Sequence, residues 1–239
     1  MVNRFFQAFY SKSPPLAVIG QCILCGDCGQ PGLDLCRPCS DELPLLSHCC
    51  QRCALPLTDG SQNNCGQCLQ SPPPFQHTKA TWHYSPPIAQ LISSFKYNHR
   101  YSYGHTLAKI MGFKLASAYT HNNLPDVIIA TPLHWYRQLR RGFNQSEQLT
   151  QSLAKHLNIP PLRAVKRCKS TPPQQSLNAR QRKQNLQGAF TVCADVTGKR
   201  LALVDDVMTT GATASEISRC LLKAGAAEIH IWCLARTPS

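Results

Sequence analysis

Four Cys-x-x-Cys pairs occupy the first third of the chain, and they limit how this part can fold more than any other feature. Ten of the fourteen cysteines lie between Cys22 and Cys68. Two residues between two cysteines let one tight turn offer both sulfurs to a single tetrahedral ion. Ten residues separate the first pair from the second and eleven separate the third from the fourth, gaps that suit a short hairpin. We therefore predict two consecutive zinc ribbons, with these ligands: Cys22, Cys25, Cys36 and Cys39 in the first, and Cys50, Cys53, Cys65 and Cys68 in the second.

Other arrangements of the same cysteines stay open at this point. The pairs can cross, or a single site can hold metal, so one or two structural Zn2+ ions are expected. Cys28, Cys49 and His48 are close enough in sequence to replace a neighbouring ligand. Redox chemistry is the rival interpretation, but four evenly spaced pairs favour metal. Because large apolar residues are scarce in this segment, metal would supply most of its folding energy.

The chain is strongly basic, with a formal net charge of +13. The stretch 135–200 contains thirteen Lys and Arg but only two acids, whereas the stretch 22–68 contains two Arg and five acids. A basic surface of this kind suits a polyanion, either a nucleic acid or a small molecule with several phosphates, or it serves only solubility. If DNA binds, we expect the larger domain to carry it and not the ribbons.

The sequence contains no pattern typical of a membrane span or a secretory signal. A membrane span needs a run of about eighteen apolar residues, and no such run is present. Polar residues and prolines interrupt the first twenty residues too often for a signal peptide. We therefore expect a cytoplasmic protein, in which reduced cysteines act as metal ligands and do not form disulfides.

The chain is predicted to have four parts. They are an N-terminal segment at 1–20, a double zinc-ribbon domain at 21–70, a proline-rich linker at 71–77 and a larger domain at 78–239. In the larger domain, strands expected at 79–85, 126–133, 200–206 and 228–235 alternate with helices expected at 86–98, 103–119, 144–157 and 213–226. This alternation predicts an α/β fold, with a parallel sheet covered by helices on both faces.

The stretch ALVDDVMTTGAT at 202–213 combines two kinds of ligand group. An apolar strand runs straight into Asp205 and Asp206, and a turn of hydroxyls and glycine follows at Thr209–Thr213. In parallel sheets, ligands bind outside the carboxyl ends of the strands. The free N–H groups at the start of the next helix suit an anion, and Gly211 lets the backbone close on a phosphate. Since the carboxylates suit hydroxyls or a hydrated cation, a sugar phosphate matches both halves.

Other nucleotide-binding motifs do not fit this stretch. A P-loop needs Gly-Lys-Ser/Thr, and a dinucleotide fold needs Gly-x-Gly-x-x-Gly early in the domain. Neither is present. A phospho-acceptor receiver domain needs many more residues after its acidic pair than the 33 that follow Asp206.

The chain resembles a known family in several separate places. Residues 201–213 resemble the phosphoribosyl pyrophosphate (PRPP) signature of type I phosphoribosyltransferases. The whole chain is similar to the ComF/GntX family, in which a zinc-ribbon segment precedes a type I phosphoribosyltransferase-like domain. Besides the cysteine pairs, the supporting pieces are FKYNHR at 95–100, TPLHWYRQLRRGFNQS at 131–146 and QQSLNARQRKQNL at 174–186.

The resemblance also implies roles for individual residues. The expected PRPP-binding residues are Asp205 and Asp206 for the ribose hydroxyls, Thr209, Thr210, Gly211, Ala212 and Thr213 for the 5-phosphate, Thr131, Pro132 and Leu133 for the pyrophosphate loop, and Arg137, Arg140 and Arg141, which together with Mg2+ would neutralise the pyrophosphate. Lys96 is either a further site residue or a surface lysine. The polar segment 169–187 is either a plain loop or a lid, with Arg180 and Arg182 as its anion-binding candidates.

The reaction implied by the resemblance is transfer of a pentosyl group with release of pyrophosphate. No pattern in the sequence identifies the nucleophile or a catalytic base. His134 stands at the right strand end, but a lone histidine at such a position more often makes a plain polar contact. The family is associated with natural competence, so PRPP and single-stranded DNA or DNA-uptake proteins are the expected partners. The alternative is a non-catalytic nucleic-acid-binding or scaffold protein that uses the PRPP fold as a ligand sensor.

Overall fold

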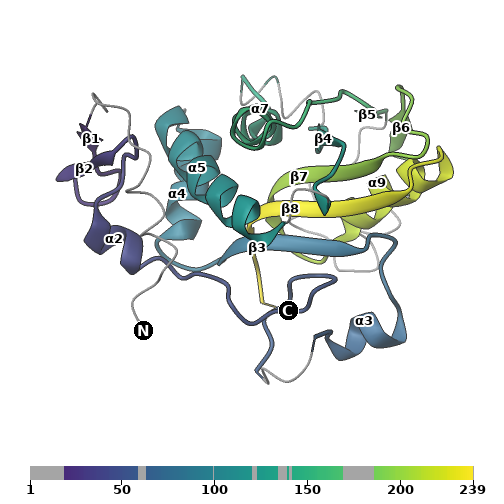
Figure 1. The fold of residues 1–239 in the computed structure, drawn as a ribbon, viewed down its shortest axis with the longest axis horizontal. Helices are drawn as coiled ribbons and strands as arrows, with labels where there is room; N and C mark the ends of the chain where they lie inside the picture. The colour runs from purple at the N-terminus through teal and green to yellow at the C-terminus, as the bar shows by residue number, and fades with distance from the viewer. Residues whose placement is uncertain are drawn as a thin grey trace.

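A four-stranded parallel sheet forms the centre of the structure (Figure 1). This computed structural model describes residues 19–58, 63–98, 100–119, 123–133, 139, 142–168 and 186–238. The strands lie in the order β3 (His77–His83), β8 (Glu228–Arg236), β7 (Arg200–Met208) and β4 (Val127–Ala130). Neighbouring strands are parallel throughout this sheet. The predicted α/β fold with a parallel sheet is therefore confirmed.

Helices cover both faces of the sheet. Three lie on one face and the fourth on the other: α4 (Ile88–Tyr97), α5 (Tyr101–Ala118) and α7 (Gln145–Leu157), and opposite them α9 (Ala212–Lys223). Along β7, Ala202 and Val204 belong to the core beneath α5 and α7, whereas Leu201 and Leu203 belong to the core beneath α9. Successive side chains of a strand point to opposite faces. The strand is therefore buried on both sides, which explains its unbroken apolar run.

The first ribbon packs against α4 and α5. Its elements are β1 (Ile19–Gln21), β2 (Cys28–Pro31) and α2 (Arg37–Asp41). Leu35 is buried in the same apolar core as Phe95 of α4 and Leu107 of α5. The Lys109 ammonium of α5 donates a hydrogen bond to the carbonyl of Gly32 (2.7 Å). This ribbon therefore shares the core of the larger domain.

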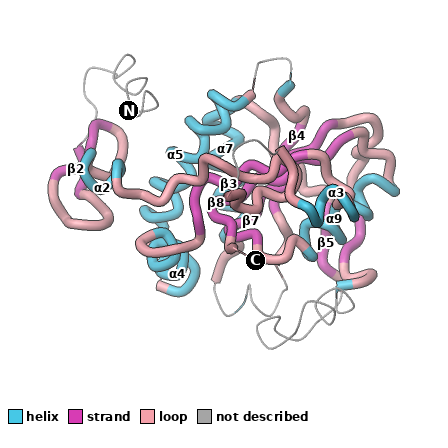
Figure 2. The backbone as a smooth tube through the Cα atoms, turned by 90° about the horizontal axis from the view of Figure 1, so that it is seen from below, coloured by secondary structure: helices cyan, strands magenta, loops and turns pink. Residues whose placement is uncertain are grey.

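The second ribbon, which contains α3 (Gly66–Gln70), lies beyond β3 and apart from the first ribbon (Figures 1 and 2). The backbone N–H of Thr78 donates to the carbonyl of Gln51 (3.0 Å), and that of Leu46 donates to the carbonyl of Thr81 (3.0 Å). These bonds join the segment 44–51 to the outer edge of β3. The segment thus covers an edge that would otherwise present unpaired backbone groups.

The remaining described segments also pack on the sheet. The proline-rich segment 71–77 carries Phe75, which is buried in the core beneath α9. A short antiparallel pair, β5 (Val165–Arg167) and β6 (Phe190–Val192), contributes Val165 and Phe190 to the same core. In the part of the chain that the structure describes, no helix is long and apolar enough to cross a membrane. The domain boundaries given above stay predictions.

Candidate functional site

The eight expected zinc ligands form two separate groups of four. In each group the sulfur atoms all lie within 4.8 Å of one another: Cys22, Cys25, Cys36 and Cys39 in the first, and Cys50, Cys53, Cys65 and Cys68 in the second. The Cys25 and Cys36 sulfurs are 3.6 Å apart, and the Cys53 and Cys65 sulfurs are 3.7 Å apart. A zinc–sulfur bond of about 2.3 Å gives a tetrahedron with edges of about 3.8 Å. Both groups therefore fit a Zn2+ ion in uncrossed pairing.

The two groups are built on the same turn. Four residues after the first cysteine, the backbone N–H donates back to the carbonyl of that cysteine, from Gly26 to Cys22 (3.0 Å) and from Ala54 to Cys50 (2.8 Å). Gly26 and Ala54 both have a positive φ, 82° and 54°. All fourteen cysteines are free of disulfides. Cys28, Cys49 and His48, the alternative ligands considered above, lie outside both groups.

Asp205 and Asp206 lie near the carboxyl end of β7. The Lys96 ammonium of α4 forms an ion pair with the Asp206 carboxylate (2.9 Å between Nζ and Oδ1). The Ser146 hydroxyl in the first turn of α7 donates to the Asp205 carboxylate (3.2 Å), and the backbone N–H of Asp206 donates to the same oxygen (2.9 Å). Burial, and then the neighbouring Asp206 carboxylate, raise the pKa of Asp205. Groups that donate hydrogen bonds to these oxygens would offset the cost of holding two carboxylates together.

The turn after β7 combines two exposed threonines with a glycine in a left-handed conformation. Thr209 and Thr210 are exposed, and Gly211 is the N-cap of α9, with a φ of 73° that residues with a Cβ rarely adopt. A Cβ on Gly211 would meet the Met208 methyl at 2.6 Å. The first N–H groups of α9 have no preceding helical turn to accept them. These N–H groups and the threonine hydroxyls together suit the oxygens of a phosphate.

The loop Thr131–Leu133 follows β4 at the carboxyl edge of the sheet, a region that we refer to as the crevice because ligands of parallel sheets bind there. Its first backbone N–H donates to the carbonyl of Val204 (2.9 Å), so the pairing with β7 continues up to the two aspartates. The Asn144 amide donates to the carbonyl of Thr131 (3.1 Å), and its side-chain oxygen accepts the N–H of Ser146 (3.0 Å). Asn144 therefore caps α7 and holds it against the end of β4. As a result, β4, β7 and the start of α7 meet at one place.

Several expected site residues lie outside the described part of the chain. These are His134, Arg137, Arg140, Arg141, Arg180 and Arg182. Their roles stay predictions. Among the described residues, the two aspartates, the Thr131–Leu133 loop and the Thr209–Thr213 turn lie at the same edge of the sheet, and Lys96 reaches this edge from α4.

Asn144 and Ser146 contact the site although the sequence analysis does not assign them to it. A signal for them exists in the segment FNQS at 143–146. An asparagine directly before an apolar helical pattern predicts an N-cap. A helix that starts soon after a parallel strand begins near the carboxyl edge of the sheet, where ligands bind.

A cavity of about 590 Å³ opens beside the Thr131–Leu133 loop. Pro132, Leu133 and Asn144 line it, and basic groups come from Arg163, which precedes β5, and from Lys166 of β5. The Thr131–Leu133 loop therefore borders a space that is lined in part by cations.

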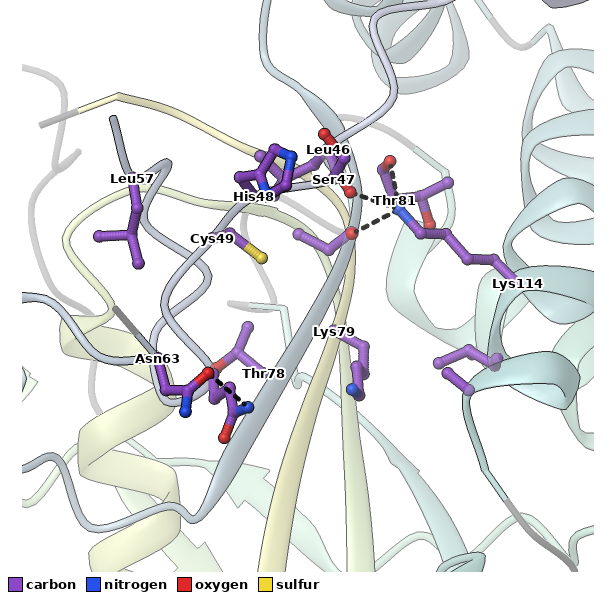
Figure 3. Close-up of a pocket in the computed structure, with 14 residues that line it drawn as sticks. Leu46, Ser47, His48, Cys49, Leu57, Asn63, Thr78, Lys79, Thr81 and Lys114 are labelled. Carbon is purple, nitrogen blue, oxygen red and sulfur yellow. Dashed lines mark hydrogen bonds between the residues drawn. The ribbon is translucent and has the colours of Figure 1, made fainter. Parts of the chain in front are cut away.

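A second cavity, of about 330 Å³, lies between the segment 46–51 and β3 (Figure 3). The Lys114 ammonium of α5 donates to the carbonyls of Leu46 (2.8 Å) and Thr81 (3.0 Å) at its wall (Figure 3). Burial lowers the pKa of Lys114 to about 8. These hydrogen bonds tie α5 to the edge of the sheet and to the connection between the ribbons, so Lys114 acts as a structural clamp.

Known proteins match both parts of this chain. The family model of the Phosphoribosyl transferase domain matches residues 139–239, and that of the Double zinc ribbon domain matches residues 14–69. The DNA utilization protein YhgH of Escherichia coli (strain K12) is 40% identical over 228 residues, which cover 93% of this chain and 99% of that protein. The chain belongs to the ComF family. Two further relatives are Competence protein F of Haemophilus influenzae (strain Rd), 39% identical over 84% of this chain and 90% of that protein, and Competence protein ComFC of Bacillus subtilis (strain 168), 24% identical over 87% and 86%.

The two matched ranges agree with the geometry of this ComF-family chain. The Double zinc ribbon range includes both groups of four cysteines, which supports structural zinc. The Phosphoribosyl transferase range includes β7 and the turn that follows it. Lys96 and Thr131 reach the same crevice from positions before that range.

Proposed function

We propose that this ComF-family protein binds PRPP in the crevice at the carboxyl ends of β4 and β7, and that it acts in the uptake or use of DNA. One observation carries the first part: Asp205 and Asp206 lie near the end of β7, just before the turn with Gly211 at the start of α9, inside the range matched by the Phosphoribosyl transferase domain. The second part is supported by relatives that are called DNA utilization protein and Competence protein F.

In the proposed complex, the two carboxylates accept hydrogen bonds from the ribose 2- and 3-hydroxyls. The 5-phosphate lies against the N-terminus of α9, where backbone N–H groups and the hydroxyls of Thr209 and Thr210 donate to its oxygens. The ammonium of Lys96, 2.9 Å from Asp206, holds that carboxylate at the crevice. Ser146 does the same for Asp205.

The pyrophosphate would lie along the backbone of Thr131–Leu133. Arg137, Arg140 and Arg141 follow this loop in the sequence and would neutralise the pyrophosphate. Mg2+, when bound with PRPP, would neutralise charge on the pyrophosphate oxygens. The reaction that such a site supports is pentosyl transfer, in which the bond from the anomeric carbon to pyrophosphate breaks as a bond to the nucleophile forms. The arginines then stabilise the negative charge that grows on the leaving group.

Titration calorimetry of the zinc-loaded protein with PRPP and Mg2+ tests the site. We expect the wild type to bind and an Asp205→Ala/Asp206→Ala variant to lose binding. The matched control is Asp195→Ala, since this carboxylate is 77% exposed and pairs with Lys199 away from the crevice. Equal binding by all three proteins would show that PRPP binds at a site other than Asp205 and Asp206. No binding by the folded, zinc-loaded wild type would refute the proposal that the protein binds PRPP.

The salt dependence of binding to single-stranded DNA tests the second part. Each phosphate contact contributes about 0.7 to the slope of log K against log salt for single strands. Replacing Arg180, Arg182 and Lys183 by glutamine is therefore expected to reduce the slope by about 2. The Asp205→Ala/Asp206→Ala variant should keep its DNA affinity, because it removes no cation. An unchanged slope would show that this segment does not hold DNA.

A further inference from the structure

Three potential metal ligands meet where β3 and β8 begin, at the amino end of the sheet. His77 of β3 and His230 of β8 are register partners, and Glu228 stands two residues before His230. Residues two apart in a strand point to the same face of a sheet, and so do register partners. The ligand atoms of these three side chains lie within 4.8 Å of one another. We refer to these three residues as the amino-end cluster.

His230 is held in this cluster by a hydrogen-bonded chain. Its side chain is almost fully buried, and Nδ1 lies 2.8 Å from the Tyr119 hydroxyl, which also accepts the indole N–H of Trp232 (3.0 Å). The other ring nitrogen, Nε2, lies 3.0 Å from the Glu228 carboxylate but outside hydrogen-bond geometry. Among the described residues this buried atom therefore has no hydrogen-bond partner, which is a costly arrangement for a polar group.

The same arrangement prepares His230 as a ligand. Histidines that bind metal donate their second ring N–H to an acceptor, which fixes the tautomer and the ring orientation. In the tautomer protonated at Nδ1, the Tyr119 oxygen is such an acceptor, and the lone pair of Nε2 then faces the cluster.

We propose that the amino-end cluster binds a divalent transition metal, with Zn2+ as the ion that fits two imidazoles and one carboxylate. This set supplies three of four tetrahedral positions and leaves the fourth to water. His77 is exposed, which gives an ion access from solvent. The nearby cation Arg200 already pairs with Asp126 (3.7 Å), so part of its charge is offset. A bound ion would cross-link β3 to β8.

This cluster lies at the end of the sheet opposite the PRPP crevice, and it shares no residue with either ribbon. Its existence therefore does not depend on the proposed function. The metal content of the intact protein, dialysed against Zn2+ with both ribbons loaded, provides the test. We expect three equivalents of zinc in the wild type and two in His77→Ala and in Glu228→Gln. His83→Ala is the matched control, because His83 lies on the same strand outside the cluster, and it should keep three.

Substitution by Co2+ gives a second readout. Cobalt in the ribbons produces thiolate-to-metal charge-transfer bands, whereas the third equivalent should add only visible d–d absorption. We also expect the third equivalent to raise Tm in the wild type and to bind more than about tenfold more weakly to His77→Ala. The proposal is overturned if the wild type stops at two equivalents, if both cluster variants keep the third with unchanged affinity, or if the third adds thiolate bands.

Discussion

The ion pair between Lys96 and Asp206 offers a direct test of how the crevice is held together. Its two side chains are 18% and 13% exposed, and the charged atoms are 2.9 Å apart. Pairs on the open surface contribute about 0.2–1 kcal/mol, and removing one partner of a fully buried pair costs about 3–5 kcal/mol. For this partly buried pair we expect a coupling energy of about 2 kcal/mol between the two side chains.

The measurement is a double-mutant cycle on the free energy of unfolding in urea, with the zinc-loaded protein near neutral pH. Lys96→Met, Asp206→Asn and the double variant complete the cycle, which isolates the pairwise contribution. The matched control is the same cycle on Lys199 and Asp195, whose charged atoms are 3.8 Å apart and whose side chains are 37% and 77% exposed. Here we expect less than about 0.5 kcal/mol, and this coupling should vanish in high salt.

Removing Lys96 alone has a further consequence for the neighbouring carboxylates. Without the cation, burial and the neighbouring Asp206 carboxylate raise the pKa of Asp205 further, because Lys96 no longer opposes them. The Lys96→Met variant should therefore lose stability relative to the wild type as the pH increases through neutrality. A coupling energy below about 0.5 kcal/mol between Lys96 and Asp206 would refute the claim that this ion pair stabilises the crevice. Lys96 would then contribute no more than an ordinary surface lysine.

Three other predictions follow from the site, the clamp and the ribbons. Gly211→Ala and Gly198→Ala both place an alanine at a φ near 70° (73° and 69°), so thermal melting should show that each costs about 1 kcal/mol of stability, with a further cost for Gly211→Ala from the Met208 methyl. Only Gly211→Ala should also weaken PRPP binding, by at least about tenfold, and calorimetry would contradict this if both variants bound PRPP alike. Lys114 has a pKa of about 8 in the folded protein against 10.5 in the free side chain, so between these pH values the unfolded chain binds a proton that the folded chain has released. The unfolding free energy of the wild type should therefore rise with pH across this range relative to Lys114→Met in urea titrations, and equal slopes would argue against a desolvated ammonium. Removal of zinc with a chelator should lower Tm for the entire protein, because Cys22 and Leu35 are buried in the core that α4 and α5 share. If calorimetry showed that the larger domain still unfolds at the same temperature without zinc, this prediction would be contradicted.

The central sheet and half of the crevice are predictable from the sequence because their signals are local. The apolar run 201–204 indicates a strand buried on both faces, and the aspartates that follow it mark the carboxyl end. Gly211 marks the turn because only a residue without a Cβ adopts its φ easily. The cysteine spacing likewise predicts which sulfurs meet, since each ribbon closes within a short stretch of chain.

Contacts between distant segments are not predictable in this way. The FKYN motif does not show that Lys96 pairs with Asp206, because the two residues are brought together only when α4 packs on the sheet. The cysteine pairs suggest two adjacent ribbons, yet one packs on α4 and α5 while the other lies beyond β3. His77 and His230 become neighbours only through the sheet register, which no local pattern specifies.

The strand order has a consequence for how the chain is completed during synthesis. β8 lies between β3 and β7, although it follows every other described strand along the chain. A nascent chain that has released β3, β4 and β7 from the ribosome can pair β4 with β7, but it lacks the strand that joins β3 to β7. The second ribbon is attached to the outer edge of β3, so it cannot join the rest of the sheet until β8 has been synthesised. A polypeptide truncated before residue 228 would therefore leave a gap in the middle of its sheet, with apolar edges open to chaperones and proteases.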